Sequence, residues 1–406
     1  MSWQEVISNE VLDIRDGTHD SPKYINTGYP LITSKNLKQG IIDFSDVNLI
    51  SEEDYIEINK RSRVNKGDIL YSMIGSIGNY ALVNEEPDYA IKNVALFKFI
   101  DHRLYNKYFL HLINSFVIER QIQKAMKGGT QKFVSLKILR NLKIPLPPLD
   151  QQKNIAAILD AADAYRQKTK ALIEKYDDLL NSIVYKCLGD SLNKDLKNIK
   201  SGSKLFLDEG FKWFTLNEIT DAIADIDHKM PKSVENGKIF LSAKDLSDNG
   251  ELDFSNPKFI SEEDFNHLSR KIKPQKFDII YSRIGAKLGK ARLVKTNHDF
   301  IVSYSCCTIR PKQDMINPLY LKYILDSEAI LKQAKHGTRG IGVPDLGMGE
   351  IREFKIPVPK KNISEKIVEL LEKTEAQKAQ AQASLAQSED LFNSLLQRAF
   401  KGELTN

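Results

Sequence analysis

The chain contains two copies of one sequence unit. Residues 51–55 (SEEDY) recur 210 residues later as residues 261–265 (SEEDF), and residues 68–75 (DILYSMIG) recur at the same distance as DIIYSRIG. Further echoes at nearly the same offset extend from His19 to the helix around residue 182. Two unrelated domains would not share this order, so the 406 residues are predicted to form two copies of one architecture.

Each copy is predicted to hold a mixed globular domain followed by a long helix. Short β-rich runs such as 68–74 and 277–284 are bounded by Gly, Pro and Asn, and helical stretches are expected at 105–127 and 319–335. The predicted fold class is α+β, with two similar mixed α/β domains separated by two long helices. The predicted boundaries are a first mixed domain at 1–149, a central spacer helix at 150–190, a linker at 191–204, a second mixed domain at 205–359 and a C-terminal spacer helix at 360–406.

The two long helices each carry an apolar stripe with heptad spacing. Apolar or small residues recur in steps of three and four at Ile155, Ile158, Ala162, Tyr165, Thr169, Leu172, Tyr176, Leu179 and Ile183. The second stripe is weaker, and Lys378 interrupts it; its members are Ile367, Leu371, Thr374, Ala381, Leu385, Ser388, Phe392, Leu395 and Ala399. An intramolecular antiparallel coiled coil with pseudo-two-fold symmetry is favoured over two helices that each pack only on their own domain.

Capping residues predict where these helices begin and end. Asp150 is expected to cap the first helix, and Asn362 with Glu365 resembles a capping box for the second. Gly189 and Gly402 fit as C-terminal stops. At about 1.5 Å per residue, the first helix would span roughly 57 Å and act as a spacer rod.

Composition narrows the class of protein but leaves its function open. The net charge of +5 permits a nucleic-acid partner without demanding one, because 59 basic and 54 acidic residues mostly cancel. Three cysteines, two of them adjacent, make neither a disulfide framework nor a metal site. With no basic-then-apolar leader and no long apolar run, a cytoplasmic location is expected and a membrane partner is not.

No complete set of catalytic motifs is found. Residues 285–291 (GAKLGKA) are one residue too short for a phosphate-binding loop, and Ala291 stands where Ser or Thr would bind magnesium. Residues 317–320 (NPLY) lack the second proline of an adenine-methyltransferase loop and fit a helix start better. The seven histidines show no metal-ligand spacing. The sequence therefore predicts no catalytic residue, no metal and no cofactor on this chain.

Polar loops at equivalent places in both copies are the candidate DNA contacts. Glycine lets backbone amides approach a phosphate, while Asn and Gln suit adenine, Arg and Lys suit guanine, and Asp suits cytosine. The alternative is that these loops are ordinary surface hairpins. The candidates in the first copy are Thr18, His19, Lys23, Ser34, Lys35, Asn36, Ser72, Gly75, Ser76, Gly78, Asn79, Lys127, Gly129, Thr130, Gln131 and Lys132. Those in the second are His228, Lys232, Lys244, Asp245, Ser282, Arg283, Lys287, Lys290, Lys335, Gly337, Thr338 and Arg339.

The ordered motifs of the chain resemble the specificity subunit of type I restriction–modification systems. The resemblance covers essentially the whole sequence and rests on residues 16–24 (DGTHDSPKY), 67–70 (GDIL), the GGTQ loop at 128–131, 144–152 (IPLPPLDQQ) and 391–404. In the second copy, residues 225–228 (DIDH) depart from the first motif, which puts the exact contact residues in doubt.

That resemblance implies a non-catalytic subunit in which each recognition domain reads one half of a bipartite DNA site. The paired helices would fix the gap between the half-sites and bind two methylating subunits, which carry S-adenosylmethionine and modify adenine. Translocating, cleaving restriction subunits would complete the nuclease. A helical-rod scaffold that does not read DNA is the alternative, and a self-contained methyltransferase or nuclease is a third possibility. The amino-acid sequence does not give the DNA target sequence, because the choice of bases also depends on loop geometry and DNA deformation.

Overall fold

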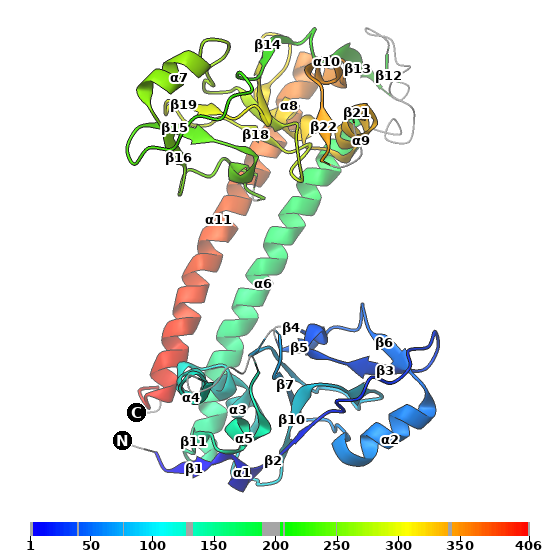
Figure 1. Cartoon of the computed structure of the whole chain (residues 1–406), viewed down its shortest axis with the longest axis vertical. Coiled ribbons are helices and arrows are strands. Elements are labelled where there is room, and N and C mark those ends of the chain that lie inside the picture. The colour runs from blue at the N-terminus through cyan, green and yellow to red at the C-terminus, as the bar shows by residue number, and fades with distance from the viewer. Residues whose placement is uncertain are drawn as a thin grey trace. The chain divides into compact units, whose positions relative to one another are not determined.

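The chain forms two compact units in a computed structural model, which describes residues 3–404 except 39, 76, 127–132, 189–203, 206–207, 249 and 340–342. Unit 1 comprises Met1–Lys170 with Ala383–Asn406, and unit 2 comprises Ala171–Gln382. Each unit therefore contains one globular domain together with part of both long helices (Figure 1). Among the described helices, none is long and apolar enough to cross a membrane.

The larger sheet of unit 1 has the strand order β2-β10-β7-β8. Its strands are β2 (Leu12–Asp16), β10 (Val94–Phe99), β7 (Ile69–Ser72) and β8 (Tyr80–Leu82). The central strand β10 pairs antiparallel with both β2 and β7, and its sequence VALFKF supplies the β-branched and aromatic residues that fit a buried strand. The sheet is thus centred on the strand with the longest apolar run.

A smaller sheet with the order β6-β3-β9 completes the domain of unit 1. Its strands are β6 (Asn48–Ile50), β3 (Tyr29–Ile32) and β9 (Ala90–Ile91), with the parallel pair β3–β9. Helix α2 (Glu52–Ser62) contacts β9 and begins at the Ser51 side chain, which accepts a hydrogen bond from the Asp54 backbone. The repeated SEEDY string is therefore a helix start.

Unit 2 repeats these elements in the same order, which confirms the prediction of two similar mixed domains. The larger sheet has the order β14-β20-β17-β18, with β14 (Thr220–Ala224), β20 (Cys306–Pro311), β17 (Ile279–Ser282) and β18 (Ala291–Leu293). The smaller sheet has the order β16-β15-β19, with β16 (Lys258–Ile260), β15 (Lys238–Leu241) and β19 (Phe300–Val302). Helix α7 (Glu262–Leu268) is capped by Ser261 just as α2 is by Ser51.

Each predicted mid-domain helix is in fact two helices. The first is divided into α3 (Asn106–Ile113) and α4 (Phe116–Met126), and the second into α8 (Pro318–Leu325) and α9 (Glu328–Gly337). The Ser115 hydroxyl donates to the Leu112 carbonyl at 2.6 Å, and the Ser327 hydroxyl donates to the Ile324 carbonyl at the same distance. These side-chain bonds compete with the helical ladder and end the first helix of each pair.

Edge strands join each domain to its long helix. In unit 1, β1 (Glu5–Ile7) pairs with β11 (Lys143–Pro145), which leads into α6 (Leu149–Leu188). In unit 2, β13 (Asp208–Thr215) pairs with β23 (Lys355–Pro359), which leads into α11 (Lys361–Phe400). Short helices α5 (Leu136–Arg140) and α10 (Met348–Arg352) precede β11 and β23.

The two long helices pack antiparallel within each unit. In unit 1, Lys170 pairs with Glu389, and the Tyr165 hydroxyl lies 3.0 Å from Ser384 Oγ. In unit 2, Leu180 and Ile183 of α6 share an apolar cluster with Leu371 of α11. Contacts pair later residues of α6 with earlier residues of α11, as expected of an antiparallel pair.

Lys378 does not break the helix pairing as its charge suggested. Its Nζ lies 2.5 Å from Asp177 Oδ1 of α6, and the Lys378 side chain is only 14% exposed. The charge that interrupts the stripe is therefore neutralised across the seam.

The predicted helix caps are partly wrong. Helix α6 begins at Leu149, so Asp150 lies in its first turn, where its charge still favours the helix dipole. Helix α11 begins at Lys361, and the Ser364 backbone donates to the Lys360 carbonyl, so Asn362 lies inside the helix. The helix starts earlier than the predicted cap in both cases, and in α6 the Gln152 backbone donates to the Pro148 carbonyl.

The C-terminal end of α11 is confirmed at Gly402. This residue has φ 78°, a left-handed conformation that glycine adopts without steric cost, and its backbone donates to the Ala399 carbonyl. Gly189 lies outside the described residues.

Buried tyrosines fasten the edge strands and yield a first prediction. The Tyr320 hydroxyl donates to the Pro357 carbonyl at 2.7 Å, as Tyr108 does to Pro145 at 2.9 Å. Tyr320→Phe leaves a buried carbonyl with one partner fewer, so we expect it to destabilise unit 2 by about 1–2 kcal/mol. Urea unfolding followed by the fluorescence of the buried Trp213, in a Trp3→Phe background, measures this loss.

Tyr24→Phe is the matched control for that experiment, because Tyr24 is 49% exposed and its change should leave the unfolding midpoint unaltered. Equal midpoints for Tyr320→Phe and the parent chain would contradict the proposed fastening role.

Candidate nucleic-acid interface

One edge of each domain collects the segments singled out from the sequence. Strands β2 and β7 both run antiparallel to β10, so their C-terminal ends, at Asp16 and Ser72, lie on the same side of the sheet. Backbone bonds from Thr18 to Ile91 and from Lys92 to Ile32 join the smaller sheet to this edge. We call this surface the recognition edge. In unit 1 it comprises residues 16–19, 33–36, 73–75, 77–79, 92–93 and 133–134, and in unit 2 residues 225–228, 242–245, 283–290, 303–305 and 343–346.

The glycine loop after β7 or β17 is tied to the loop that follows α4 or α9. In unit 1, Ile74 forms a β-bridge with Phe133, and the Val134 backbone donates to the Met73 carbonyl at 2.9 Å. In unit 2, Ile284 bridges to Asp345 in the same way. Two loops far apart in sequence are thus neighbours on each recognition edge.

The glycines at the start of these loops have a conformational role. Gly75 has φ 73° and Gly285 has φ 88°, backbone geometry that other residues adopt only with strain. Nothing lies within 4 Å of a Cβ placed on either one, so both face open space. Each loop therefore presents backbone outward at a sharp turn.

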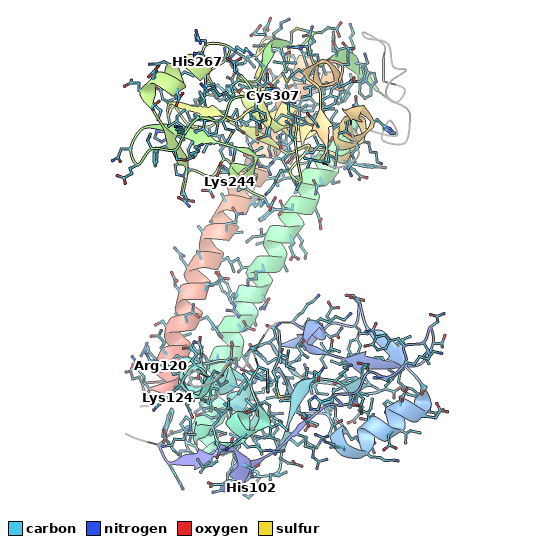
Figure 2. The ribbon with its side chains drawn as sticks, viewed as in Figure 1. His102, Arg120, Lys124, Lys244, His267 and Cys307 are labelled. Carbon is cyan, nitrogen blue, oxygen red and sulfur yellow. The ribbon has the colours of Figure 1, made fainter. Side chains whose placement is uncertain are left out.

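Most predicted contact residues lie at the surface, where a DNA strand could reach them. Lys244 is 67% exposed at its side chain and Lys35 is 47% exposed (Figure 2 labels Lys244). The exposed candidates are His19, Lys23, Lys35, Gly75, His228, Lys232, Lys244 and Lys335. The half-buried ones are Thr18, Ser34, Gly78, Asn79, Lys287, Lys290, Gly337 and Thr338. Ser76, Lys127, Gly129, Thr130, Gln131 and Lys132 lie outside the described residues, as does the side chain of Arg339.

Four further candidates are buried. Ser72 and Ser282 are fully buried at the strand ends. Asn36 Oδ1 accepts from the Thr33 backbone and hydroxyl, and Asp245 accepts from the equivalent groups of Ser242, so both brace the same short turn. Their difference between the copies, which suggested base reading, is a change of capping residue. The burial of these four side chains argues against their direct contact with DNA.

Arg283 is also buried, and its side chain has a structural role. Its side chain is 4% exposed, and it donates to Asp225 at 2.9 Å, to Asp345 at 3.0 Å and to the Leu346 carbonyl at 3.1 Å. The guanidinium thus ties the end of β14 to the loop after α9. Sequence alone could not show this, because its partners lie 58 and 62 residues away.

An aspartate–histidine pair occupies equivalent positions on both recognition edges. In unit 1, His19 Nε2 lies 2.9 Å from Asp16 Oδ2, and His19 Nδ1 lies 2.9 Å from Asn93 Oδ1. Asp16 is also paired with Arg61 of α2. Sequence reasoning found His19 but missed Asn93 and Arg61, whose roles come only from the folding of distant segments onto this edge.

The surroundings of His19 favour its charged form. The hydrogen bond to Asn93, followed by the one to Asp16, raises the pKa of His19 above its ordinary value. The nearby Arg61 charge opposes this shift more weakly.

In unit 2, His228 Nε2 lies 3.2 Å from Asp225 Oδ2 and 3.0 Å from Arg283 Nη2, and its ring stacks on Tyr304 at 4.8 Å. The aspartate and histidine therefore recur, but their partners differ between the two edges.

The described residues include no cluster that could hold a metal ion. The cysteines are equally unsuited to chemistry, since burial raises the pKa of Cys306 to about 12 and raises that of Cys307 further. The recognition edges can offer charge and hydrogen bonds to a ligand, and their described residues include no nucleophile–base pair.

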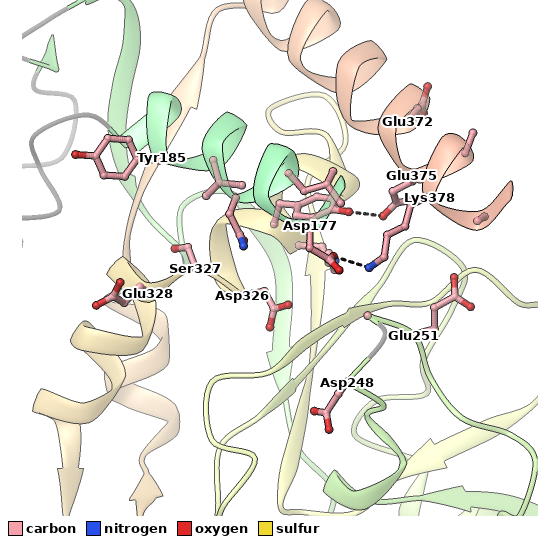
Figure 3. Close-up of a pocket in the computed structure, with 18 of the residues that line it drawn as sticks. Asp177, Tyr185, Asp248, Glu251, Asp326, Ser327, Glu328, Glu372, Glu375 and Lys378 are labelled. Atoms are coloured by element: carbon pink, nitrogen blue, oxygen red, sulfur yellow. Dashed lines mark hydrogen bonds and ion pairs between the residues drawn. The ribbon is translucent and has the colours of Figure 1, made fainter. Parts of the chain in front are cut away.

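A cavity of about 920 Å³ lies in unit 2 between its domain and the two long helices (Figure 3). Its charged wall is internally paired, with Asp177 bound to Lys378 and the Tyr323 hydroxyl donating to Glu375 at 2.7 Å. Lys322 lines it as a buried amine, and burial lowers the pKa of this lysine to about 8. A cavity of about 820 Å³ occupies the corresponding place in unit 1, where Leu110 stands at the position of Lys322.

The comparisons with known proteins agree on one family. The family model described as "Type I restriction modification DNA specificity domain" matches residues 2–175 and again 215–387. The chain is 23% identical over its whole length to the type I restriction enzyme EcoBI specificity subunit of Escherichia coli, and the match covers 86% of that protein.

Two solved structures are similar to the chain in fold. The S subunit of the type I restriction–modification system from M. genitalium has a TM-score of 0.56 at 15% identity, with 98% of this chain and 96% of that one covered. A chain from a structure titled for complex assembly and conformational transition of the type I R-M system has a TM-score of 0.58 at 17% identity, with 99% and 98% covered.

The burial of Arg283 gives a second prediction. Arg283→Ala removes the cation between two carboxylates, so we expect unit 2 to lose about 3 kcal/mol of stability. Lys244→Ala, on the same edge but exposed, should change stability by no more than about 0.5 kcal/mol. Urea unfolding monitored by Trp213 compares the two variants, and equal stabilities would show that Arg283 has no structural role.

Proposed function

Because the chain belongs to the family of type I restriction–modification specificity subunits, we propose that the recognition edge of each unit reads one half of a bipartite DNA site. The protein is a sequence-specific DNA-recognition subunit without catalytic activity of its own. The two matched specificity domains carry this conclusion. What the family leaves open is which surface contacts DNA, and that is the substance of the proposal.

The exposed and half-buried residues of the recognition edges support it. Cations such as Lys35, Lys244 and Lys290 would contact phosphates, and the outward-turned loops at Gly75 and Gly285 would let backbone amides approach them. Asn79 would bond a base edge. The other members of the proposed contact set are Thr18, His19, Lys23, Ser34, Gly78, His228, Lys232, Lys287, Lys335, Gly337, Thr338 and Arg339, with Ser76 and the loop residues Lys127, Gly129, Thr130, Gln131 and Lys132.

Four members of the seam predicted for α6 are exposed rather than buried in it, and we propose the row that they form as the docking surface for methylating subunits. Ile158, Tyr165, Leu172 and Leu179 of α6 recur every seven residues and are 37–55% exposed. A heptad row of this kind is the pattern by which a helix packs against another helix. Its exposure in this chain leaves it available to a partner.

Two of these four positions are also apolar in the second copy. Leu370 and Leu391 of α11, 44% and 56% exposed, stand 212 residues after Ile158 and Leu179. A docking surface present twice favours two copies of one partner. The chain would therefore bind two methylating subunits, each carrying S-adenosylmethionine. Translocating and cleaving restriction subunits would join this complex, which would act in the cytoplasm.

The helix pair is further proposed to act as a ruler. On a duplex of fixed pitch, the length of the helices would set both the separation and the rotational phase of the half-sites. The alternative of a helical scaffold that does not read DNA gains no support from the matched DNA specificity domains. A gel shift with duplex DNA, with and without a methylating subunit, tests it, because a DNA reader must show salt-sensitive binding in one of the two conditions.

A third prediction compares equivalent lysines on the two edges. Lys35→Ala should weaken recognition of one half-site, and Lys244→Ala should weaken recognition of the other. Each change should lower the slope of log affinity against log salt concentration by about one, the value expected for one lost phosphate contact. Methylation of a library of split targets by the chain with its methylating partner measures both half-sites at once. If either variant impairs both half-sites equally, the assignment of one edge to one half-site is wrong.

A fourth prediction tests the ruler. Inserting seven residues after Thr169 and seven after Glu389 preserves the heptad seam, because Lys170 and Glu389 lie opposite each other. The rod lengthens by about 10.5 Å, so the gap in the methylated motif should grow by about 3 base pairs. Methylome sequencing of a host that carries the variant reads the gap directly, and an unchanged gap would refute the ruler.

A further inference from the structure

Lys322 of α8 places a buried amine at the cavity of unit 2 (Figure 3). The residue is only 5% exposed, and its Nζ lies 3.8 Å from the position of a Cβ built on Gly250, which also lines the cavity. Among the residues that the structure describes, this amine forms no hydrogen bond and no ion pair. It lies over the Tyr323 ring, 3.7 Å from the ring centroid. A lysine ammonium has three donors, and burying it without acceptors is costly.

The two carboxylates that act on this amine are bound by other cations. Asp326, just after α8, pairs with Arg292 at 3.1 Å, and Glu375 of α11 pairs with Lys295 at 3.2 Å. Burial is the main cause that lowers the pKa of Lys322, while the two carboxylates raise it and the two other cations lower it. The surrounding charges therefore oppose one another, and the donors of Lys322 stay unused.

The other carboxylates of the cavity wall are paired or exposed. The pairs are Asp177 with Lys378, Asp248 with Lys287, Glu251 with Lys295 and Glu328 with Lys332. Glu372 of α11 is exposed to solvent. A ligand with one negative charge can thus reach Lys322 without breaking an ion pair, whereas a second charge would be repelled by these carboxylates.

The long helices supply an apolar part of the wall. It consists of Leu180, Val184 and Leu188 of α6 with Ala376 and Ala379 of α11. The cavity volume of about 920 Å³ lies within the range of about 300–1,000 Å³ that is usual for sites of small molecules. An apolar body placed in this cavity would be removed from water while an acidic group meets the amine.

The site is present once per chain. In the corresponding cavity of unit 1, Leu110 replaces the lysine, and the nearby Lys107 and His111 are both bound to Asp160. The duplication therefore kept the cavity, and only the second copy has a buried amine with unused donors among its described residues.

We propose that the cavity of unit 2 binds one small organic acid, whose carboxylate pairs with the Lys322 amine and whose apolar body packs against the long helices. A carboxylate fits better than a phosphate dianion because it brings a single charge. The proposal concerns a cavity apart from the recognition edges, so it stands or falls independently of DNA binding.

The effect of pH follows from the ammonium being the form that binds an acid. The pKa of Lys322 is about 8, so the amine is mostly charged at neutral pH and loses its proton as the pH rises through that value. Affinity for an acid should be constant below this range and should fall above it by up to about tenfold per pH unit. A bound carboxylate should in turn raise the pKa of Lys322.

Ligand-observed NMR on the full chain tests binding. The probes are butyrate, hexanoate, benzoate and 4-phenylbutyrate, each up to about 10 mM, the weak end of specific affinity. We expect 4-phenylbutyrate to bind, and its neutral amide and phenyl phosphate to bind about tenfold more weakly or not at all. If no acid binds, or if the amide or the phosphate binds as well as the acid, the proposal is wrong.

Two lysines of the same cavity provide the variant and its control. Lys322→Met removes the amine but keeps the length of the side chain, and should weaken binding of 4-phenylbutyrate by about tenfold or more. It also removes a buried charge, so the thermal midpoint of the free chain should not fall. Lys332→Met, at a lysine that is 53% exposed and paired with Glu328, should bind the acid like the parent. Equal affinities for the two variants would overturn the proposal.

Lysine NMR gives a readout that a purely structural role of Lys322 would not change. In the full chain labelled with ¹³C-lysine, the signal lost in Lys322→Met identifies this residue. Its pKa should lie near 8 in the free chain and should rise when 4-phenylbutyrate is added. A pKa that does not respond to the bound acid would place the ligand elsewhere and refute the assignment.

Discussion

The burial of the ends of the long helices within the domain cores is the interaction on which the architecture of each unit depends. In unit 1, Ile155 and Leu159 of α6 and Phe392 and Phe400 of α11 belong to the same apolar cluster as the central strand. In unit 2, Val184 of α6 and Val368 of α11 do the same. Because the helices complete these cores, a domain cannot turn on its helix ends without exposing apolar surface.

Polar contacts sharpen that attachment in the first copy. The buried Gln152 accepts from the Tyr105 backbone at 2.8 Å and donates to the carbonyls of Arg103 and Pro147. Gln152 of the IPLPPLDQQ motif thus joins the helix to the domain, and its loss would leave three backbone groups without this partner. A spacer helix can orient a DNA-binding domain only if the end of the helix is fixed to that domain in this way.

The two copies share a frame and differ in the side chains mounted on it. The cation–carboxylate pair Lys98–Asp68 of unit 1 becomes Arg310–Asp278 in unit 2, with the same role beside the central strand. Other changes alter the surface: the partners of the edge histidines differ, and Leu110 gives way to the buried Lys322. Duplication keeps the frame because packing constrains it, whereas the edge faces solvent and is free to diverge.

The sequence by itself determined the duplication, the fold class, the family and the pairing of the two long helices, because each depends on local order and periodicity that need no knowledge of long-range contacts. It also indicated the exposed lysines of the recognition edge. Tertiary structure alone decided that Arg283, Asn36 and Asp245 are structural and that Asn93 completes the site of His19. The physical reason is that burial and hydrogen-bond partners arise from segments that lie tens of residues apart, and the same Arg or Asn in a loop can equally read a base or brace a turn.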